Sequence, residues 1–335
     1  MAAKPNIYDV ARLAEVSHQT VSRVINDSPK LRPETRKRVQ DAMRSLGFVP
    51  NAAARALVTS RTKMVGILIT DSIYNGPAGM LHAMQEEARN NGYFSVTVSV
   101  DPTDAESITD GLAQLRKLGI EGLLVITPQS DFVGVVEKAV TSIPVVYLDT
   151  PSTAGREAIS VDNYQAARAA TAHLISLGHT NLLHISGPQN WFDATTRRQG
   201  FLDEARAAGV AAQVVDGDWS IETGRMLGER FDLSTQITAI FAANDHLALG
   251  LLSAFSKRGI RVPQDVSVIG FDDIPEAAYF EPPLTTMHPN FAELGRVAMG
   301  KMLGTLNEEA SEHSSSLVPE LIVRKSTAQR ETRDN

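Results

Sequence analysis

Six short runs of apolar residues follow one another from residue 64 onward, and they constrain the fold more than any other feature of this chain. The runs are MVGILI, GLLVI, PVVYL, NLLHIS, TAIFAA and VSVIGF, and stretches with helical spacing separate them. Continuous rather than alternating apolarity is typical of strands buried on both faces, and therefore of parallel sheets with helices on each side. We expect an α/β core of doubly wound parallel sheets, and six strands with their helices are too many for one small unit.

The composition narrows the class of protein. With 335 residues, of which 43% are hydrophobic, the chain is long enough for two or three domains. It has no cysteine, which excludes disulfides, thiolate metal sites and a catalytic thiol. The N-terminal sequence MAAKPNIYDV lacks the apolar segment of a signal peptide, and no run approaches the ~18 apolar residues that span a membrane. We therefore expect a cytoplasmic protein with no membrane association, no metal site and no cofactor.

Net charge is divided unevenly along the chain. Residues 1–63 contain 12 Lys or Arg and 5 Asp or Glu, a balance of +7, whereas the remainder has a balance of −14. A basic patch confined to one small unit is the electrostatic footprint of nucleic-acid binding, because attraction to phosphates supplies the sequence-independent part of affinity. A solvated basic face would explain the charge equally well, so the motifs must decide.

The basic segment contains the signals of three short helices. Asn6 is a candidate N-cap, with Asp9 as its partner in a capping box, and the helix that follows has one apolar face. Ser17 is a good N-cap for a second helix, and Pro33 is well placed at the first position of a third. Two helices within 20 residues, joined by a short turn, have the spacing of a helix-turn-helix. We expect residues 1–50 to form a DNA-binding head.

Polar side chains occupy the outer face of the second predicted helix. In a helix-turn-helix, the N-terminal residues of the second helix enter the major groove, where Gln pairs with adenine, Arg pairs with guanine, and His or Ser hydrogen-bonds to base edges. A merely solvated helix face is the alternative, but the charge balance and the turn spacing favour base reading. The candidate base-reading residues are His18, Gln19, Ser22 and Arg23.

Longer motifs carry a family resemblance. The sequence IYDVARLAEVSHQTVSRVIN, followed by TRKRVQDAMRSLGFVPNAAARAL, resembles the head and hinge of the lactose/galactose repressor (LacI/GalR) family of bacterial transcription regulators, close to its lactose-repressor branch. The resemblance continues through GILITD, LDTP, HLISLGH, GDWS, FAANDHLALG and DVSVIGFDDIP. It implies an operator-binding homodimer whose core binds a small molecule, usually a sugar or a purine. The DNA contacts that it implies are Asn6, Tyr8, Ser17, His18, Gln19, Thr20, Ser22, Arg23, Asn26 and Thr35.

A hinge follows the head at residues 51–61. Its alanines, leucine and arginine favour a short helix, but so little apolar surface cannot stabilise an isolated helix in water, so we expect it to order only on DNA. The family resemblance implies that two such helices pair in the minor groove, where Leu57 inserts between base pairs and Asn51 and Ala54 lie close by. A plain flexible linker is the alternative.

The family resemblance also implies how the core is divided. It predicts two similar lobes of the type found in periplasmic binding proteins, joined by three crossings of the chain. The N-terminal lobe comprises residues 62–161 and 291–319, and the C-terminal lobe comprises residues 162–290 and 320–331.

Polar residues follow several of the predicted core strands. In open parallel sheets, ligands bind outside the carboxyl ends of the strands. A sugar needs carboxylates and amides that form paired hydrogen bonds, an arginine fork, and an aromatic face for its ring. The candidate effector residues are Thr70, Asp149, Arg197, Trp219, Asn244 and Asp272, of which the last five lie where the family resemblance places the effector. Each has a structural alternative, since Asp at a strand end is often a cap, as we expect for Asp245 and Asp273, and Trp219 alone would suit the core.

Other classes of function are disfavoured. The sequence contains no G-x-G-x-x-G, Walker-type G-K-[ST], G-x-S-x-G or H-E-x-x-H motif of an enzyme. A sugar-binding transport protein would share the core but would be exported and would lack the head. The sequence therefore predicts a non-enzymatic DNA-binding regulator, most simply a repressor whose operator affinity changes when a small sugar binds between the lobes. A purine- or phosphosugar-responsive corepressor-type regulator stays open as an alternative.

The end of the chain bears on assembly. After SLVPELIVRKS the sequence finishes in the short polar segment TAQRETRDN, without the leucine heptads that make tetramers. We expect a homodimer that reads a pseudopalindromic operator, with half-sites about one helical turn apart.

Overall fold

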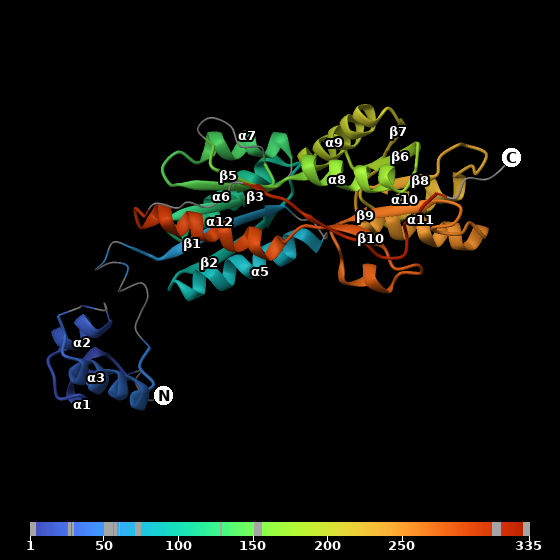
Figure 1. Cartoon of the computed structure of the whole chain (residues 1–335). Helices are drawn as coiled ribbons and strands as arrows, with labels where there is room; N and C mark the ends of the chain where they lie inside the picture. The colour runs from blue at the N-terminus through green and yellow to red at the C-terminus, as the bar shows by residue number, and fades with distance from the viewer. Residues whose placement is uncertain are drawn as a thin grey trace. The chain divides into compact units, whose positions relative to one another are not determined.

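The computed structural model consists of two compact units, Met1–Lys63 and Met64–Asn335 (Figure 1). It describes residues 5–25, 28, 30–49, 56, 59, 61–70, 75–127, 129–150, 156–309 and 316–330. Four of the predicted DNA contacts, Asn26, Asn51, Ala54 and Leu57, lie outside the described residues, and so does most of the predicted hinge helix.

Residues 5–49, as far as they are described, contain the three helices that the sequence predicts for the head. Asn6 Oδ1 accepts hydrogen bonds from the backbone N–H groups of Tyr8 and Asp9, and the Asp9 carboxylate accepts one from the backbone N–H of Asn6, so the predicted capping box is present. Ser17 Oγ accepts a hydrogen bond from the backbone N–H of Thr20, at 3.2 Å. The helices are α1 (Ile7–Leu13), α2 (His18–Ile25) and α3 (Pro33–Leu46).

A small apolar core holds these helices together. Val10, Val21 and Val39 come one from each helix and are fully buried. Helix α3 begins with a proline and without a side-chain cap, and it ends at Gly47, whose φ of +60° suits glycine. The apolar residues that the helical spacing predicts to face inward therefore do so, and the polar positions of α2 are left on the surface.

The described residues of the second unit form two six-stranded sheets. The first sheet has the strand order β11-β5-β4-β3-β1-β2, and every pairing in it is parallel. Its strands are β1 (Met64–Thr70), β2 (Phe94–Val100), β3 (Gly122–Ile126), β4 (Val145–Leu148), β5 (Ala158–Val161) and β11 (Ser316–Leu317). Helices α5 (Asn75–Asn90) and α12 (Phe291–Leu306) cover one face, and α6 (Ala105–Lys117) and α7 (Ser130–Ala139) cover the other.

The second sheet has the same arrangement. Its strand order is β12-β10-β9-β8-β6-β7, and only the β10–β12 pairing is antiparallel. Its strands are β6 (Asn181–Ser186), β7 (Ala211–Asp216), β8 (Ala239–Ala242), β9 (Ser267–Phe271), β10 (Thr285–His288) and β12 (Glu320–Ile322). Helices α8 (Asn163–Ser176) and α9 (Phe192–Ala208) cover one face, α10 (Ile221–Arg230) and α11 (Asp245–Arg258) cover the other, and a 3-10 helix (η1, Pro275–Tyr279) follows β9.

The chain passes between the two sheets three times. It leaves the first sheet after β5, returns after β10 to form α12, and crosses again in the few residues between β11 and β12 (Figure 1). One apolar cluster contains residues of both sheets, such as Ile67 and Phe241. The predicted fold class, a helix-turn-helix head followed by two doubly wound parallel-sheet lobes, is confirmed.

The prediction of strands was incomplete. All six apolar runs form strands, but six further strands do not have a continuous apolar run. Among these, β2 and β7 lie at sheet edges, where one side of each strand has no strand neighbour and polar residues are tolerated. No helix of the described residues is long and apolar enough to cross a membrane.

Helices α10 and α11 cross at glycines, which yields a test of the packing. A methyl group added at Gly250 would lie 2.1 Å from the carbonyl oxygen of Ile221, whereas one added at Gly134, in α7, would meet nothing within 4 Å. We expect Gly250→Ala to lower the free energy of unfolding by about 1–3 kcal/mol. We expect Gly134→Ala to leave it unchanged or to raise it by up to about 1 kcal/mol. Urea unfolding of the two variants measures the difference, and equal effects would contradict this account of the α10–α11 contact.

Candidate functional site

The candidate effector residues come from both sheets. Asp149 directly follows β4 of the first sheet, whereas in the second sheet Asp272 directly follows β9 and Asn244 caps α11 after β8. Arg197 lies on α9, and Trp219 precedes α10. Four of these residues are less than a tenth exposed, namely Asp149, Asn244, Arg197 and Trp219, and the Asp272 side chain is 17% exposed. All six predicted effector residues, with Thr70 at the end of β1, are therefore largely buried polar or aromatic groups at the carboxyl ends of strands or close to them.

The segment between β8 and α11 anchors two of these residues. Arg197 Nη1 donates a hydrogen bond to the carbonyl oxygen of Ala243, at 2.5 Å. Asn244 Nδ2 donates to the carbonyl oxygen of Trp219 at 3.0 Å, while Asn244 Oδ1 accepts from the backbone N–H of Leu247 and so caps α11. The Asn244 side chain therefore holds both the Trp219 turn and the helix end.

The next residue, Asp245, anchors a third element. Its Oδ2 accepts a hydrogen bond from the backbone N–H of Ile274 at 2.9 Å, and its Oδ1 accepts one from the Thr286 hydroxyl at 2.7 Å. Ile274 lies two residues after Asp272, so Asp245 fixes the turn that carries Asp272. Asp245 is fully buried, and its carboxylate has the structural role that the sequence analysis expects rather than a ligand-binding one. Residues 243–245 thus connect the elements that carry Arg197, Trp219 and Asp272.

Arg197 is surrounded by groups that match a guanidinium. Its Nε donates to Asn163 Oδ1 at 2.7 Å, and its Nη2 lies 3.9 Å from Asp272 Oδ1. Its central carbon lies 3.5 Å from the centre of the Phe271 ring and 5.5 Å from that of the Trp219 ring. These are cation–π distances, so two aromatic rings and a set of oxygen atoms stabilise the buried positive charge.

Three carboxyl groups share this single cation. Burial raises the pKa of Asp149 well above its usual value, and the neighbouring Asp193 raises it further, while Arg197 acts in the opposite direction. Burial likewise raises the pKa of Asp193, and it raises the pKa of Asp272 to about 7 although Arg197 lowers it. The cause in each case is the cost of holding a carboxylate away from water with one shared guanidinium as compensation.

Four residues at this edge of the sheets have left-handed backbone conformations that are unusual outside glycine. They are Asp149 (φ +54°), Trp219 (φ +70°), Asp272 (φ +106°) and Asp273 (φ +48°). Such conformations cost on the order of 1–3 kcal/mol each and persist where the surroundings determine them. Asp273 shows how this is done, because its carboxylate accepts hydrogen bonds from Arg324 Nη2 at 2.6 Å and contacts His288 Nδ1 at 3.0 Å. Asp273 is therefore a turn residue, as expected.

Two polar atoms of the candidate site are buried without a hydrogen-bond partner among the described residues. They are Asp149 Oδ1 and Trp219 Nε1. One is an acceptor and the other a donor, and leaving either unpaired in the interior costs about 1–3 kcal/mol. The Trp219 ring also packs edge-on against Trp191, with 5.8 Å between ring centres. The arrangement is suited to a small molecule that carries both hydrogen-bonding groups and an apolar face.

The sequence predicted most of this group but not all of it. Thr70 ends β1, two strands away from β4 in the sheet order and hence roughly 10 Å from Asp149 along the edge. Asn163, Asp193 and Phe271 were missed, although each contacts or interacts with Arg197. Asp193 lies one helical turn before Arg197 on α9, and this spacing was the available signal.

The predicted DNA-reading residues lie mainly on the surface of the head. The rings of Tyr8 and His18 are 5.3 Å apart, so the first residues of α1 and α2 adjoin. The Ser17 and Thr20 hydroxyls are hydrogen-bonded at 3.0 Å. Among the other described members, Gln19 and Arg23 are exposed, and Ser22 and Thr35 are half-buried. The described residues thus form a polar surface that includes the start of α2.

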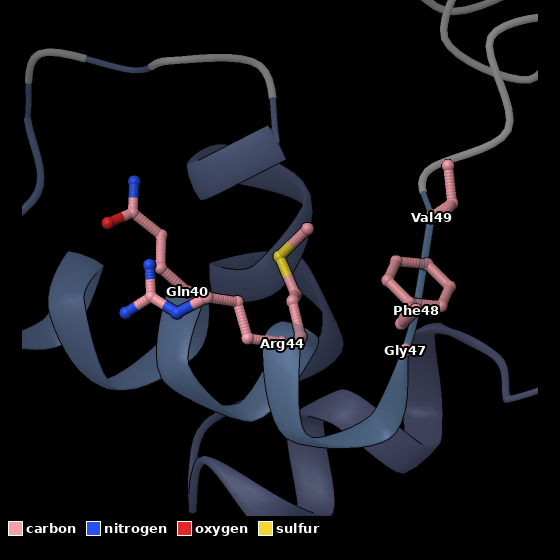
Figure 2. Close-up of a pocket in the computed structure, with 6 residues that line it drawn as sticks. Gln40, Arg44, Gly47, Phe48 and Val49 are labelled. Carbon is pink, nitrogen blue, oxygen red and sulfur yellow. The ribbon is translucent and has the colours of Figure 1, made fainter.

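The head also has a hollow, which lies apart from the predicted base-reading residues. Figure 2 shows it at the end of α3, where Phe48 and Val49 follow the helix and the side chains of Gln40 and Arg44 lie on its outer face. Val49 is 82% exposed, and none of the lining residues is a predicted base-reading or effector residue. This hollow is therefore not the candidate effector site.

Comparison with known proteins gives the same two-part division. Residues 6–51 match the model of bacterial regulatory proteins of the lacI family, and residues 171–327 match the periplasmic binding protein-like domain. The chain is 35% identical over 332 residues to the HTH-type transcriptional repressor PurR of Haemophilus influenzae (strain ATCC 51907), covering 96% of this chain and 98% of the relative. The chain belongs to the LacI family. It is also 30% identical to the lactose operon repressor of Escherichia coli (strain K12), over 96% of this chain and 90% of that protein.

Solved structures of the family have the same fold. The Lac repressor dimer bound to operator and the anti-inducer ONPF matches with a TM-score of 0.86 and 29% identity, over 97% of this chain and all of that one. The complex of the transcriptional regulator CelR with cellobiose matches with a TM-score of 0.70 and 28% identity, over 96% and 99% of the two chains. The family resemblance seen in the sequence is confirmed, and the chain is a DNA-binding transcriptional repressor of this family with an effector-binding core.

The raised pKa of Asp272 yields a test of the geometry around Arg197. Because its pKa is about 7 in the folded protein and ~3.9 in the unfolded chain, the folded state binds more protons between these values, so the free energy of unfolding falls as pH rises from 4 to 7. Asp272→Asn removes this contribution. We expect the melting temperature of the variant, relative to the unmodified protein, to increase by roughly 2 °C or more between pH 5 and pH 8.

The matched control is Asp216→Asn, since the Asp216 side chain is 62% exposed. Its melting temperature should follow that of the unmodified protein at both pH values. An identical pH dependence for Asp272→Asn and the unmodified protein would contradict the burial of an ionisable carboxyl beside Arg197.

Proposed function

We propose that this repressor is controlled by a small sugar-class molecule bound at Asp149, Arg197, Trp219, Asn244 and Asp272, with Thr70 at the margin of the site. The observation that carries the proposal is the pair of buried, unpaired atoms, Asp149 Oδ1 and Trp219 Nε1, close to a buried arginine. A sugar satisfies both, because each of its hydroxyls donates and accepts hydrogen bonds while its ring carbons present an apolar face.

The charge of the site argues against a phosphosugar. A phosphate needs cationic or N–H groups that are free to donate to it. The Arg197 guanidinium already donates to Asn163 and Ala243 and lies beside Asp272, so it is not free to donate to a phosphate. The structurally similar CelR is a complex with cellobiose, and another structure of this fold is the Lac repressor bound to ONPG, with a TM-score of 0.85 and 29% identity. These neighbours support a glycoside over a purine corepressor.

We also propose how the DNA is read. Helix α2 enters the major groove with His18, Gln19, Ser22 and Arg23, while Asn6, Tyr8, Ser17, Thr20, Asn26 and Thr35 contact the operator around it. A homodimer places two heads on a pseudopalindrome in the cytoplasm, and the hinge residues Asn51, Ala54 and Leu57 contact the minor groove.

We propose that the core consists of two lobes. The N-terminal lobe comprises residues 62–161 and 291–319, and the C-terminal lobe comprises residues 162–290 and 320–331. The core binds an effector rather than catalysing a reaction.

The proposed regulation uses the connection between the two sheets. Asp149 follows the first sheet, whereas Arg197 and Asp272 belong to elements of the second, so a ligand that contacts all three favours one arrangement of the lobes. A ligand changes operator affinity only if it binds one arrangement better than the other. We propose that the sugar favours the arrangement that releases DNA.

Base reading is tested by a double substitution. Exchanging both His18 and Gln19 for other polar residues should change which operator bases are preferred while leaving non-specific DNA binding nearly unchanged, because base contacts specify and phosphate contacts position. Arg23→Ala should cost roughly 1–3 kcal/mol of operator affinity. Selection from a randomised DNA pool, with affinity for unrelated DNA as the control, measures both effects. The same preferred sequence before and after the exchange would contradict the assignment of α2.

Regulation is tested by linkage. An inducing sugar should weaken operator binding with a coupling of roughly 1–3 kcal/mol, and operator DNA should weaken sugar binding by the same factor. The measurement is operator affinity against a panel of galactosides, glucosides and purine bases. Arg197→Ala should abolish the response. Arg198→Ala, which removes a half-exposed guanidinium paired with Asp216, should retain it. An effective ligand whose action survives Arg197→Ala would show that the site lies elsewhere, and a response to a purine base alone would contradict the sugar class.

A further inference from the structure

Three acidic side chains and one basic side chain meet at the proposed effector site. Asp149, Asp193 and Asp272 interact electrostatically with one another, and Arg197 is the cation that acts on all three. Charges taken out of water must be compensated within the protein or by whatever binds there. The described residues supply too little positive charge at this place.

Among the contacts of the described residues, the guanidinium of Arg197 moreover lies closer to Asp272 than to the other two carboxyl groups. Its guanidinium donates to Asn163 and to the Ala243 carbonyl, and it lies beside Asp272 and over the Phe271 ring. The paired carboxyl of the site is therefore Asp272. Asp149 and Asp193 have no comparable ion pair among the described residues.

The carboxyl groups of Asp149 and Asp193 differ in their hydrogen bonds. Asp193 Oδ1 accepts one hydrogen bond, from Asn163 Nδ2 at 3.0 Å. Asp149 is more than nine-tenths buried, and its Oδ1 has no partner among the described residues. An unpaired, buried carboxylate oxygen beside a second carboxyl group requires a donor, and a positively charged donor forms the strongest hydrogen bonds to it.

The aromatic residues nearby suit a cation as well. Trp191 and Trp219 pack edge-on at 5.8 Å, and the Trp219 ring already lies 5.5 Å from one cation, that of Arg197. The faces of tryptophan rings attract positive charge. The aromatic surroundings and the unpaired carboxylate are separate observations, and both favour a positively charged group over a neutral one.

We infer that the effector carries a protonated amino group, which lies against the carboxyls of Asp149 and Asp193. The inference rests on the proposed function, since it specifies the chemical class of the ligand at the same site. The ligand class is then an amino sugar or an iminosugar. A hydroxyl of the ligand accepts a hydrogen bond from Trp219 Nε1, and its ammonium group donates hydrogen bonds to the two carboxylates. Asp193 is then the residue that determines specificity for the charge of the ligand.

The test compares matched ligands with the full-length protein by titration calorimetry at pH 7. The pairs are galactosamine with galactose, glucosamine with glucose, and mannosamine with mannose, each with its N-acetyl derivative, together with the iminosugar 1-deoxynojirimycin. An amine of pKa ~8 is mostly protonated at this pH, whereas the N-acetyl group carries no charge. We expect at least one amine to bind roughly tenfold or more tightly than its neutral counterpart, as a charged hydrogen bond implies.

Two variants assign the effect to Asp193. Asp193→Asn preserves the shape of the side chain and should reduce the amine preference, which is the ratio of amine to neutral-sugar affinity in the same variant, to less than about threefold. Asp203→Asn is the control on the same helix, because the carboxylate of Asp203 contacts Tyr164 and Arg206, outside the site. It should retain the full preference.

The outcomes separate this inference from the proposed function. Neutral sugars that bind at least as tightly as the amines, with binding lost in Arg197→Ala, would overturn the amino-group inference and leave the proposed function standing. An amine preference that survives in Asp193→Asn would overturn the assignment to this pair of carboxyls. Absence of binding by every sugar and iminosugar would overturn both proposals.

Discussion

The buried guanidinium of Arg197 is the group on which the arrangement of the core depends. A cation that is 5% exposed is stable only if fixed oxygen atoms and aromatic rings replace its water. Asn163, Ala243 and Asp272 provide the oxygens, and Phe271 provides a ring at 3.5 Å. These partners belong to α8, the β8–α11 connection and the end of β9, so one ion brings together segments that are far apart in the chain.

The same cation links the two sheets. Asn163 begins α8 directly after the chain has left the first sheet at β5, and it contacts both Arg197 and Asp193. Asp149, at the end of β4, is also stabilised by the charge of Arg197. A change in the relation between the sheets therefore changes the environment of one buried ion, which makes their arrangement a property that a small ligand can shift.

The fold could be predicted where burial imposes a simple pattern on the residues. The six central strands lie within sheets covered by helices, so most of their positions are apolar, and all six were found. Strands such as β2 and β7 have a free edge, and β11 and β12 consist of only two and three residues. Their pairing depends on neighbours that arrive from distant parts of the chain, and no local pattern reports it.

The candidate sites show the same division between local and distant causes. The sequence by itself determined the helix ends of the head, because the capping box of Asn6 and Asp9 and the stop at Gly47 are contacts within a few residues. It also marked Asp149, Arg197 and Asp272 by their chemistry and by family motifs. Only the tertiary structure decided that Asp193 and Asn163 join them and that Asp149 Oδ1 is left unpaired. The reason is physical, since the charge balance of a buried site depends on which side chains folding brings together, and these come from separate helices and strands.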